Sequence, residues 1–307
     1  RHTICRVPGM RCCAATRRAS PGPGSASENV AGIGGIQLKD TTVNVGNGNG
    51  VHPEASLAQT HSGIINVDGS GTGILFEDLA DGSDTDQMLD TSDSAGLVIN
   101  VNAADGHGIV TRSTADLKTG VSVNVLNKDG KAALVVEGTT KNVAQSGVLA
   151  SISEQSAVVD IVSHVLEAFT NTGRIEALDA AHKALERLEG AGITLINAAG
   201  ASIVGQVNLL SGDNTVILES GSSATDITSG AGADRFILKD IQAEDSATLF
   251  TSLNGGAGDD TLQVENSIYT LRSARAISGI EHISLSDNSV FTLDKVSLAL
   301  GDDGQDA

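Results

Sequence analysis

Residues 211–264 alternate between short β-rich segments and tight polar corners, and this alternation constrains the fold more than any other feature of the sequence. The β-rich segments lie at residues 214–218, 235–238 and 261–264. Each follows a cluster of Gly, Asp, Asn or Ser. These residues form tight turns because glycine admits positive φ and Asp or Asn bonds to nearby backbone. Corners and strands that recur at short intervals are typical of a solenoid, in which the chain winds into stacked rungs.

The composition also favours a solenoid over a globular core. The chain of 307 residues contains 36 Gly, no Trp, five Phe and one Tyr. A globular core of this size is normally anchored by more large aromatic side chains. The narrow interior of a solenoid needs none, because stacked Val, Ile, Leu and Ala fill it. We therefore predict an all-β chain that forms a β-solenoid over residues 29–307.

An apolar–Asn–apolar unit recurs in the first half of the chain, centred on Asn44, Asn66, Asn100 and Asn124. Successive units are separated by intervals in the low twenties, which is typical of a solenoid rung, except for a longer interval between the second and third. The longer interval contains an acidic segment, residues 77–93, which we expect to protrude from a corner as a loop. The asparagines either stack as a hydrogen-bonded ladder or face solvent between core residues, and the sequence leaves both alternatives open.

A second pattern conflicts with the rungs. Residues 158–168 and 174–189 space their apolar residues as a helix does. In the second segment these are Ile175, Leu178, Leu185 and Leu188. Aligned with the rungs, however, residues 169–177 match residues 59–67, because both place a glycine before a strand. We expect solenoid throughout, with a short helix near residues 179–189.

Residues 1–28 differ from the remainder of the chain. They carry five Arg and no acidic residue in the first 20 positions, followed by Pro, Ser and Gly. They lack the apolar segment of a signal peptide, and we expect a poorly ordered basic tail. All three cysteines lie here, at Cys5, Cys12 and Cys13, with no spacing typical of a metal site. The cysteine-free remainder is unlike a small disulfide-stapled domain.

The net charge of −19 and the pI near 4.5 exclude one class of partner. Nucleic acid needs Lys and Arg to contact its phosphates, so we expect no nucleic-acid binding. An acidic surface suits an extracellular protein, including one that takes up divalent cations. No run of about 18 apolar residues is present, so we expect no membrane span.

Short motifs in the second half resemble the repeating units of autotransporter passenger domains. The motifs lie at residues 171–175, 196–205, 212–216, 230–234, 277–285 and 288–293. Pertactin-like passengers are right-handed parallel β-helices displayed by Gram-negative bacteria. The resemblance therefore implies a single-stranded right-handed parallel β-helix on the cell surface. It also implies a missing C-terminal translocator barrel at the outer membrane, since no alternating barrel strands follow Leu300.

Residues 255–263 match the GGxGxDxUx nonapeptide of RTX-type calcium β-rolls. In those rolls, glycine carbonyls and the Asp at the sixth place bind Ca²⁺, which the resemblance carries to Gly256, Gly258 and Asp260. Calcium prefers six to eight oxygens, and one nonapeptide supplies about half of them. The related segment at residues 229–234 does not follow in tandem and lacks the first glycine of the pair. The alternative is a plain corner without metal.

Motifs for catalysis are absent from the sequence: there is no nucleophile elbow, zinc-protease motif or phosphate loop. Asp81, Asp84 and Asp86 could imitate the acid cluster of a β-helix polysaccharide enzyme, or belong to a solvated loop. We expect a non-enzymatic passenger fragment that acts in adhesion or aggregation. Its partners would be host or neighbouring-cell surface molecules, including glycans, or further copies of itself. The alternatives are a carbohydrate-active β-helix enzyme and a calcium-dependent structural surface module.

Overall fold

The computed structural model shows an all-β parallel β-solenoid of about nine turns with essentially no helix. It describes residues 38–51, 61–78, 88–244, 246, 248–273, 276–298 and 300–301, together with two short strands near the start, β1 (Arg6–Val7) and β2 (Met10–Arg11). The chain divides into two compact units. Unit 1 contains residues 1–141 and 145–160, and unit 2 contains residues 142–144 and 161–307.

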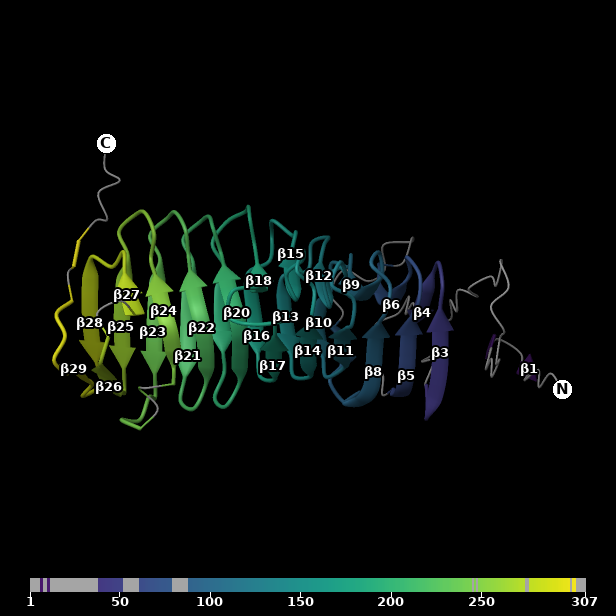
Figure 1. Cartoon of the computed structure of the whole chain (residues 1–307), viewed down its shortest axis with the longest axis horizontal. Coiled ribbons are helices and arrows are strands. Elements are labelled where there is room, and N and C mark those ends of the chain that lie inside the picture. The colour runs from purple at the N-terminus through teal and green to yellow at the C-terminus, as the bar shows by residue number, and fades with distance from the viewer. Residues whose placement is uncertain are drawn as a thin grey trace. The chain divides into compact units, whose positions relative to one another are not determined.

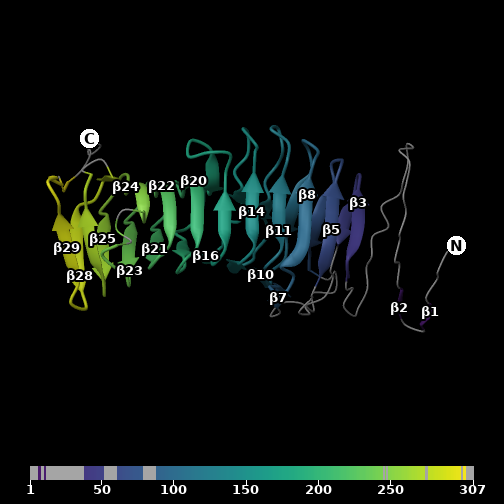
Figure 2. The ribbon, with the colours of Figure 1, turned by 60° about the horizontal axis from the view of Figure 1, so that its bottom comes forward.

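The rungs of unit 1 stack through parallel strand pairs on several faces. Figure 2 shows one face, on which strands from successive rungs lie side by side. These strands are β3 (Thr41–Val45), β5 (Ser62–Val67), β8 (Gly96–Val101), β11 (Ser122–Val125) and β14 (Val148–Ser151). The other faces contain β4 (Asn49–Val51), β6 (Thr72–Phe76), β9 (His107–Thr111) and β12 (Leu134–Val136), and the pair β7 (Met88–Thr91) and β10 (Asp116–Thr119).

Unit 2 repeats this arrangement, with its strands coloured from teal to yellow in Figure 1. One face consists of β16 (Ala168–Asn171), β19 (Thr194–Asn197), β21 (Thr215–Glu219), β23 (Arg235–Lys239), β25 (Thr261–Glu265) and β28 (His282–Ser286). A second consists of β17 (Arg174–Glu176), β20 (Ser202–Asn208), β22 (Ser223–Thr228), β24 (Phe250–Asn254) and β27 (Ile277–Ser278). Strand β18 (Lys183–Glu186) pairs with the end of β20, and β26 (Ile268–Leu271) pairs with β29 (Val290–Leu293). Strands β13 (Asn142–Gln145) and β15 (Val159–Ile161) cross the boundary between the units.

The core is built from the apolar positions of the repeated units. Ile65, Ile99 and Val123 lie opposite one another in β5, β8 and β11, and all three are fully buried. Alternation along each strand turns these side chains inward and the intervening residues outward. Each fully buried Val or Ile stabilises the fold by about 1.5–3 kcal/mol, so the rungs depend on stacking more than on local preference.

Three of the six aromatic residues form a stack. In unit 2, the rings of Phe250 and Tyr269 have centroids 5.7 Å apart, and those of Tyr269 and Phe291 lie 5.8 Å apart. The interplanar angles of 22° and 10° make both pairs stacked. Tyr269 is buried at the centre of this column, and burial raises its pKa to about 12.

The helix expected near residues 179–189 is wrong. The chain there forms a turn followed by β18, and the helically spaced residues 158–168 contain β15 and the start of β16. Leu185 is fully buried, but Leu178 and Leu188 are 43% and 55% exposed, so the apolar spacing marks no common face. Hydrogen bonds and burial within the rungs, where β17 and β18 pair with β20, override helix propensity.

Two predicted segments lie largely outside the described residues. The basic tail, residues 1–28, is described only at β1 and β2. The acidic segment is described at residues 77–78 and from Met88 onwards, so Asp81, Asp84 and Asp86 fall outside the description. The prediction of a loop is wrong for residues 88–91, which form β7 and pair with β10 as part of a rung.

Candidate functional site

The corners that precede the strands of one face of unit 2 stack on one another. Gly232 and Gly258 have φ of 136° and 139°, a range that favours glycine. A Cβ on Gly258 would lie 1.9 Å from the carbonyl oxygen of Gly232, and one on Gly256 would lie 1.9 Å from that of Gly230. Only glycine therefore allows these rungs to approach so closely, which explains the glycine-rich segments at residues 229–234 and 255–260.

A polar residue stands immediately before each of the successive strands β21, β23, β25 and β28 of this face, and these residues form a ladder that we call the corner ladder (Asn214, Asp234, Asp260 and Glu281). The backbone N–H of Asn214 donates to Oδ1 of Asp234 at 2.6 Å, and that of Asp234 donates to Oδ1 of Asp260 at 2.7 Å. The backbone N–H of Asp260 donates in turn to Oε2 of Glu281 at 2.7 Å. Each side chain thus satisfies the backbone of the preceding rung.

The two aspartates of the corner ladder are almost fully buried, at 1% exposed for Asp234 and 0% for Asp260. The second carboxylate oxygen of each, Oδ2, is buried without a hydrogen-bond partner among the described residues. Burial, together with the negative charges of Asp234, Glu281 and Asp259, raises the pKa of Asp260 to about 6, although the hydrogen bond from the backbone of Asp234 acts to lower it. Burial likewise raises the pKa of Asp234. The corner therefore concentrates negative charge where water does not reach it.

The three residues predicted to bind calcium lie together in this corner. Asp260 belongs to the corner ladder, and Gly256 and Gly258 are part of the turn that leads to it. Among the described residues, no group of three or more His, Cys, Asp or Glu side chains is arranged to hold a metal ion. Calcium binding here stays a prediction, and any such site would depend on backbone oxygens.

Unit 1 contains a different stack, the asparagine ladder (Asn44, Asn66, Asn100 and Asn124). The side-chain nitrogen of Asn66 donates to Oδ1 of Asn44 at 2.9 Å. The same bond recurs from Asn100 to Asn66 and from Asn124 to Asn100, both at 3.2 Å. Of the two alternatives drawn from the sequence, the structure shows the hydrogen-bonded ladder. Its amides lie between buried residues, and they remain exposed or half-buried on the outer face.

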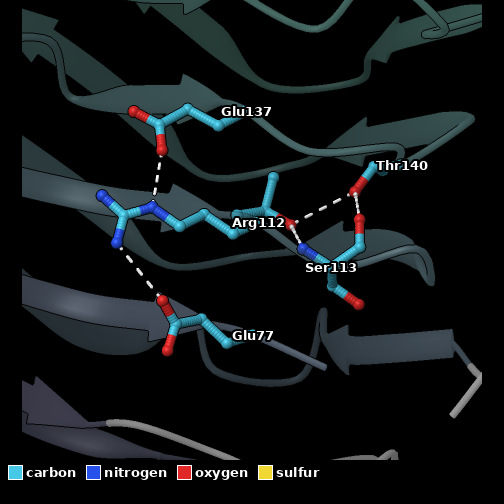
Figure 3. Close-up of polar contacts among 6 residues, drawn as sticks. Glu77, Arg112, Ser113, Glu137 and Thr140 are labelled. Atoms are coloured by element: carbon cyan, nitrogen blue, oxygen red, sulfur yellow. Dashed lines mark hydrogen bonds and ion pairs between the residues drawn. The ribbon is translucent and has the colours of Figure 1, made fainter. Parts of the chain in front are cut away.

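A column of alternating charge in unit 1 includes Glu77, the first residue of the acidic segment. Arg112 donates through Nε to Glu137 at 2.6 Å and through a terminal nitrogen to Glu77 at 3.2 Å (Figure 3). The hydrogen bond to Glu137 raises the pKa of Arg112. The guanidinium is therefore held in its charged form, which suits a structural ion pair and does not suit a catalytic base.

Polar contacts beside this column fix the start of the acidic segment. Asp78 accepts hydrogen bonds from the hydroxyl of Ser113 at 2.5 Å and from the backbone N–H of Thr114 at 2.9 Å. The hydroxyl of Thr140 donates to the carbonyl of Ser113 (Figure 3). It also lies 3.2 Å from the hydroxyl of Thr111. Successive rungs therefore hold Glu77 and Asp78, the first two residues of the acidic segment.

The sequence motif identified Asp260 and missed the rest of the corner ladder. The available signal was positional, because a polar residue recurs one place before each of the successive strands β21, β23, β25 and β28. The intervals between these polar residues are unequal, since the loops between rungs differ in length. This inequality conceals the repeat in the sequence.

Comparisons with protein-family models, curated proteins and solved structures return no match for this chain. In the part of the chain that the structure describes, no helix is both long and apolar enough to span a membrane.

Proposed function

We propose that the chain is a non-enzymatic extracellular scaffold of the autotransporter-passenger type, which acts in adhesion or aggregation. The asparagine ladder carries this proposal. Four identical amides stand in register on one outer face of unit 1, each held by its neighbour. A stack of this kind presents the same polar group at every rung, about 4.8 Å apart.

A repeated polar row suits an extended partner better than a small molecule. Each amide retains hydrogen-bonding capacity beyond the ladder, since an amide has two donor hydrogens and two acceptor lone pairs. A glycan chain or a second solenoid could match several amides at once, and many weak contacts would then act through multivalency. The partners in this proposal are surface molecules of host or neighbouring cells, including glycans, or other copies of the chain.

The proposed place of action is the surface of a Gram-negative cell. The net charge of −19 and the absence of cysteine after Cys13 suit an exported solenoid. The resemblance of the corner motifs to autotransporter passengers supports the same location, with attachment through a translocator barrel.

The test is adhesion of beads that carry the full chain at graded densities. We expect binding to glycan-bearing cells, or aggregation of the beads, to rise steeply with density because the contacts are multivalent. Replacing Asn44 and Asn66 by Ala should lower adhesion several-fold. The matched control replaces Thr194 and Thr215 by Ala, which are neighbouring polar residues on an outer face of unit 2.

Two outcomes would contradict the proposal. One is adhesion that is absent at every density or that is indifferent to the Asn44 and Asn66 variants while circular dichroism shows an intact fold. The other is steady turnover of an acidic polysaccharide by the soluble chain, which would support the carbohydrate-active enzyme in its place.

A further inference from the structure

A second row of outward side chains runs beside the asparagine ladder of unit 1. Its members stand two residues before the asparagines, or before Ala150 in β14, so both rows point away from the core. From rung to rung the second row consists of Thr42, Ile64, Val98, Ser122 and Val148. Ile64 and Val148 are each 40% exposed, and Val98 is half-buried. A largely apolar row and an amide row therefore lie side by side on the strands β3, β5, β8, β11 and β14 (Figure 2).

None of the residues in these five strands carries a charge. The whole chain holds 38 acidic and 19 basic residues among 307, so an uncharged face of this length stands out on an acidic protein. Asp40 and Asp68 are adjacent in sequence, but they lie at corners outside the strands. One face of unit 2 differs, because β21 and β25 each end in glutamate and β23 has a basic residue at both ends.

The absence of charge selects against charged partners. A charged ligand on this face would give up water without an opposite charge to pair with, which is costly. The net charge of −19 also opposes the approach of an anionic polymer or of a second copy of the chain. The face therefore suits a partner that is itself neutral.

The size of the face also decides against a second copy. Five strands about 4.8 Å apart, with two rows of side chains on each, give a face about 20 Å long and about 15 Å wide. Its area of about 300 Å² is well below the roughly 800 Å² per partner that a stable protein complex buries. A chain that is one molecule wide can instead use the whole length of both rows.

A neutral glycan has the chemistry that both rows match. Each asparagine inside the ladder keeps one hydrogen and one lone pair beyond the bonds to its neighbours, and a sugar hydroxyl can both donate and accept. Sugar rings also have apolar C–H faces, which would cover Ile64, Val98 and Val148 and remove them from water. Because the strands are in register, the rows are straight, and a ribbon-like β-1,4-linked chain fits them better than a helical glycan.

We propose that this face of unit 1 binds a straight, neutral, β-1,4-linked glycan. The glycan lies along the direction in which the rungs stack, with hydroxyls on the asparagine ladder and ring faces on the second row. The inference rests on the proposed adhesive function and names its partner, a neutral glycan in place of another copy of the chain.

The test measures binding of β-1,4-linked oligomers of glucose, mannose and N-acetylglucosamine to the soluble full chain by calorimetry. We expect at least one series to bind, and its five-unit oligomer to bind at least about tenfold more tightly than its two-unit oligomer, because the longer chain contacts more rungs. Hydroxyethyl cellulose should bind more tightly than carboxymethyl cellulose, which has the same backbone but carries anionic groups.

The variant that probes the second row is Ile64→Asp. It should weaken binding of the five-unit oligomer by at least about tenfold, because it removes an apolar contact and places an unpaired charge under the glycan. The matched control is Leu210→Asp, which makes the same change at a side chain of unit 2 that is also 40% exposed, and it should keep full binding. If circular dichroism shows that Ile64→Asp does not fold, Val148→Asp takes its place.

Three results would overturn the inference: none of the three oligomer series binds, the folded variant binds as well as the wild type, or carboxymethyl cellulose binds as tightly as hydroxyethyl cellulose. Self-association of the soluble chain that the same variant abolishes would also overturn it, because the face would then belong to a second copy. In each case, beads that still adhere leave the proposed function standing. Oligomer binding by a chain whose beads do not adhere would contradict the adhesive function alone.

Discussion

The asparagine ladder of unit 1 and the corner ladder of unit 2 both stack polar side chains rung upon rung, but they differ in what each side chain offers the next. An amide carries a donor and an acceptor, so the bond from Asn66 to Asn44 can be repeated indefinitely. A carboxylate only accepts. Asp234 and Asp260 therefore accept hydrogen bonds from the backbone N–H groups of the preceding rung, and one oxygen of each has no hydrogen-bond partner among the described residues.

This difference shows what a parallel solenoid demands of its polar columns. Equivalent residues lie next to one another on successive rungs, so each side chain has a side chain of the same kind as its neighbour. Stacked amides stabilise one another because each both donates and accepts a hydrogen bond, whereas stacked groups of the same charge repel one another. Unit 1 shows a second solution in Arg112, which alternates in sign with Glu77 and Glu137.

The largest effect that we predict tests how closely the corners of unit 2 approach. Gly256→Ala should lower the free energy of unfolding by at least about 2 kcal/mol, because its φ of 97° and the oxygen of Gly230 both oppose a Cβ. Gly200 has a φ of 76° with nothing within 4 Å, so Gly200→Ala should cost only about 1–2 kcal/mol. Urea unfolding, with hydrogen exchange to resolve the two units, measures both.

The control in unit 1 is Gly46, where nothing lies within 4 Å of an added Cβ. Gly46→Ala should change stability by no more than about 0.5 kcal/mol. Equal losses at Gly46 and Gly256 would show that neither the positive φ of Gly256 nor the nearby oxygen of Gly230 opposes a side chain there.

The second prediction converts one rung of the asparagine ladder into a carboxylate. Asn100→Asp should cost about 1 kcal/mol at pH 7, because it loses the donor to Asn66 and turns a charge toward that oxygen. Asn44→Asp is the matched control. The side chain of Asn44 accepts from Asn66 and makes no other hydrogen bond among the described residues, so its substitution should be nearly neutral. Equal losses in thermal unfolding would mean that the donors of the ladder contribute nothing.

The rungs themselves could be predicted from the sequence because the repeated signal was both apolar and regular. The apolar–Asn–apolar units appear in the structure as in-register strands, with Asn44, Asn66, Asn100 and Asn124 opposite one another. The motif at residues 196–205, on which the resemblance to a β-helix rests in part, contains the end of β19 and the start of β20. Burial between rungs makes such a pattern visible without a structure.

Two features could not be predicted, for separate physical reasons. Residues 174–189 have helical spacing, yet Leu188 faces solvent, since pairing with β20 decides which side chains turn inward. The corner ladder joins residues that stand at unequal distances along the chain, so no fixed period links Asp234 to Asp260. These residues meet because their rungs stack, and in this part of the chain the sequence has no regular period that would reveal the stacking.

The third prediction concerns Tyr269, whose phenol is buried in its neutral form within the aromatic stack. The pKa of Tyr269 is about 12 in the folded chain, above its ordinary value of 10.0, because burial opposes the charged form. The unfolded chain therefore releases this proton first, and the contribution of Tyr269 to stability is full below pH 10 and falls as the pH rises toward 12. Tyr269→Phe should lose less stability than the wild type over this interval, as measured by urea unfolding. Parallel pH profiles for the two proteins would contradict it.

The smallest effect concerns the column in which charges alternate. Arg112→Gln should cost about 0.5–1 kcal/mol, because both ion pairs are partly exposed and such pairs contribute little in water. The loss should shrink in high salt, which screens the pairs that the variant removes. Lys128 forms an ion pair with Glu154 and has a more exposed side chain, so Lys128→Gln should cost less. If Arg112→Gln instead stabilised unit 1 in low salt, alternation of sign would not be the device that lets charged residues stack in this solenoid.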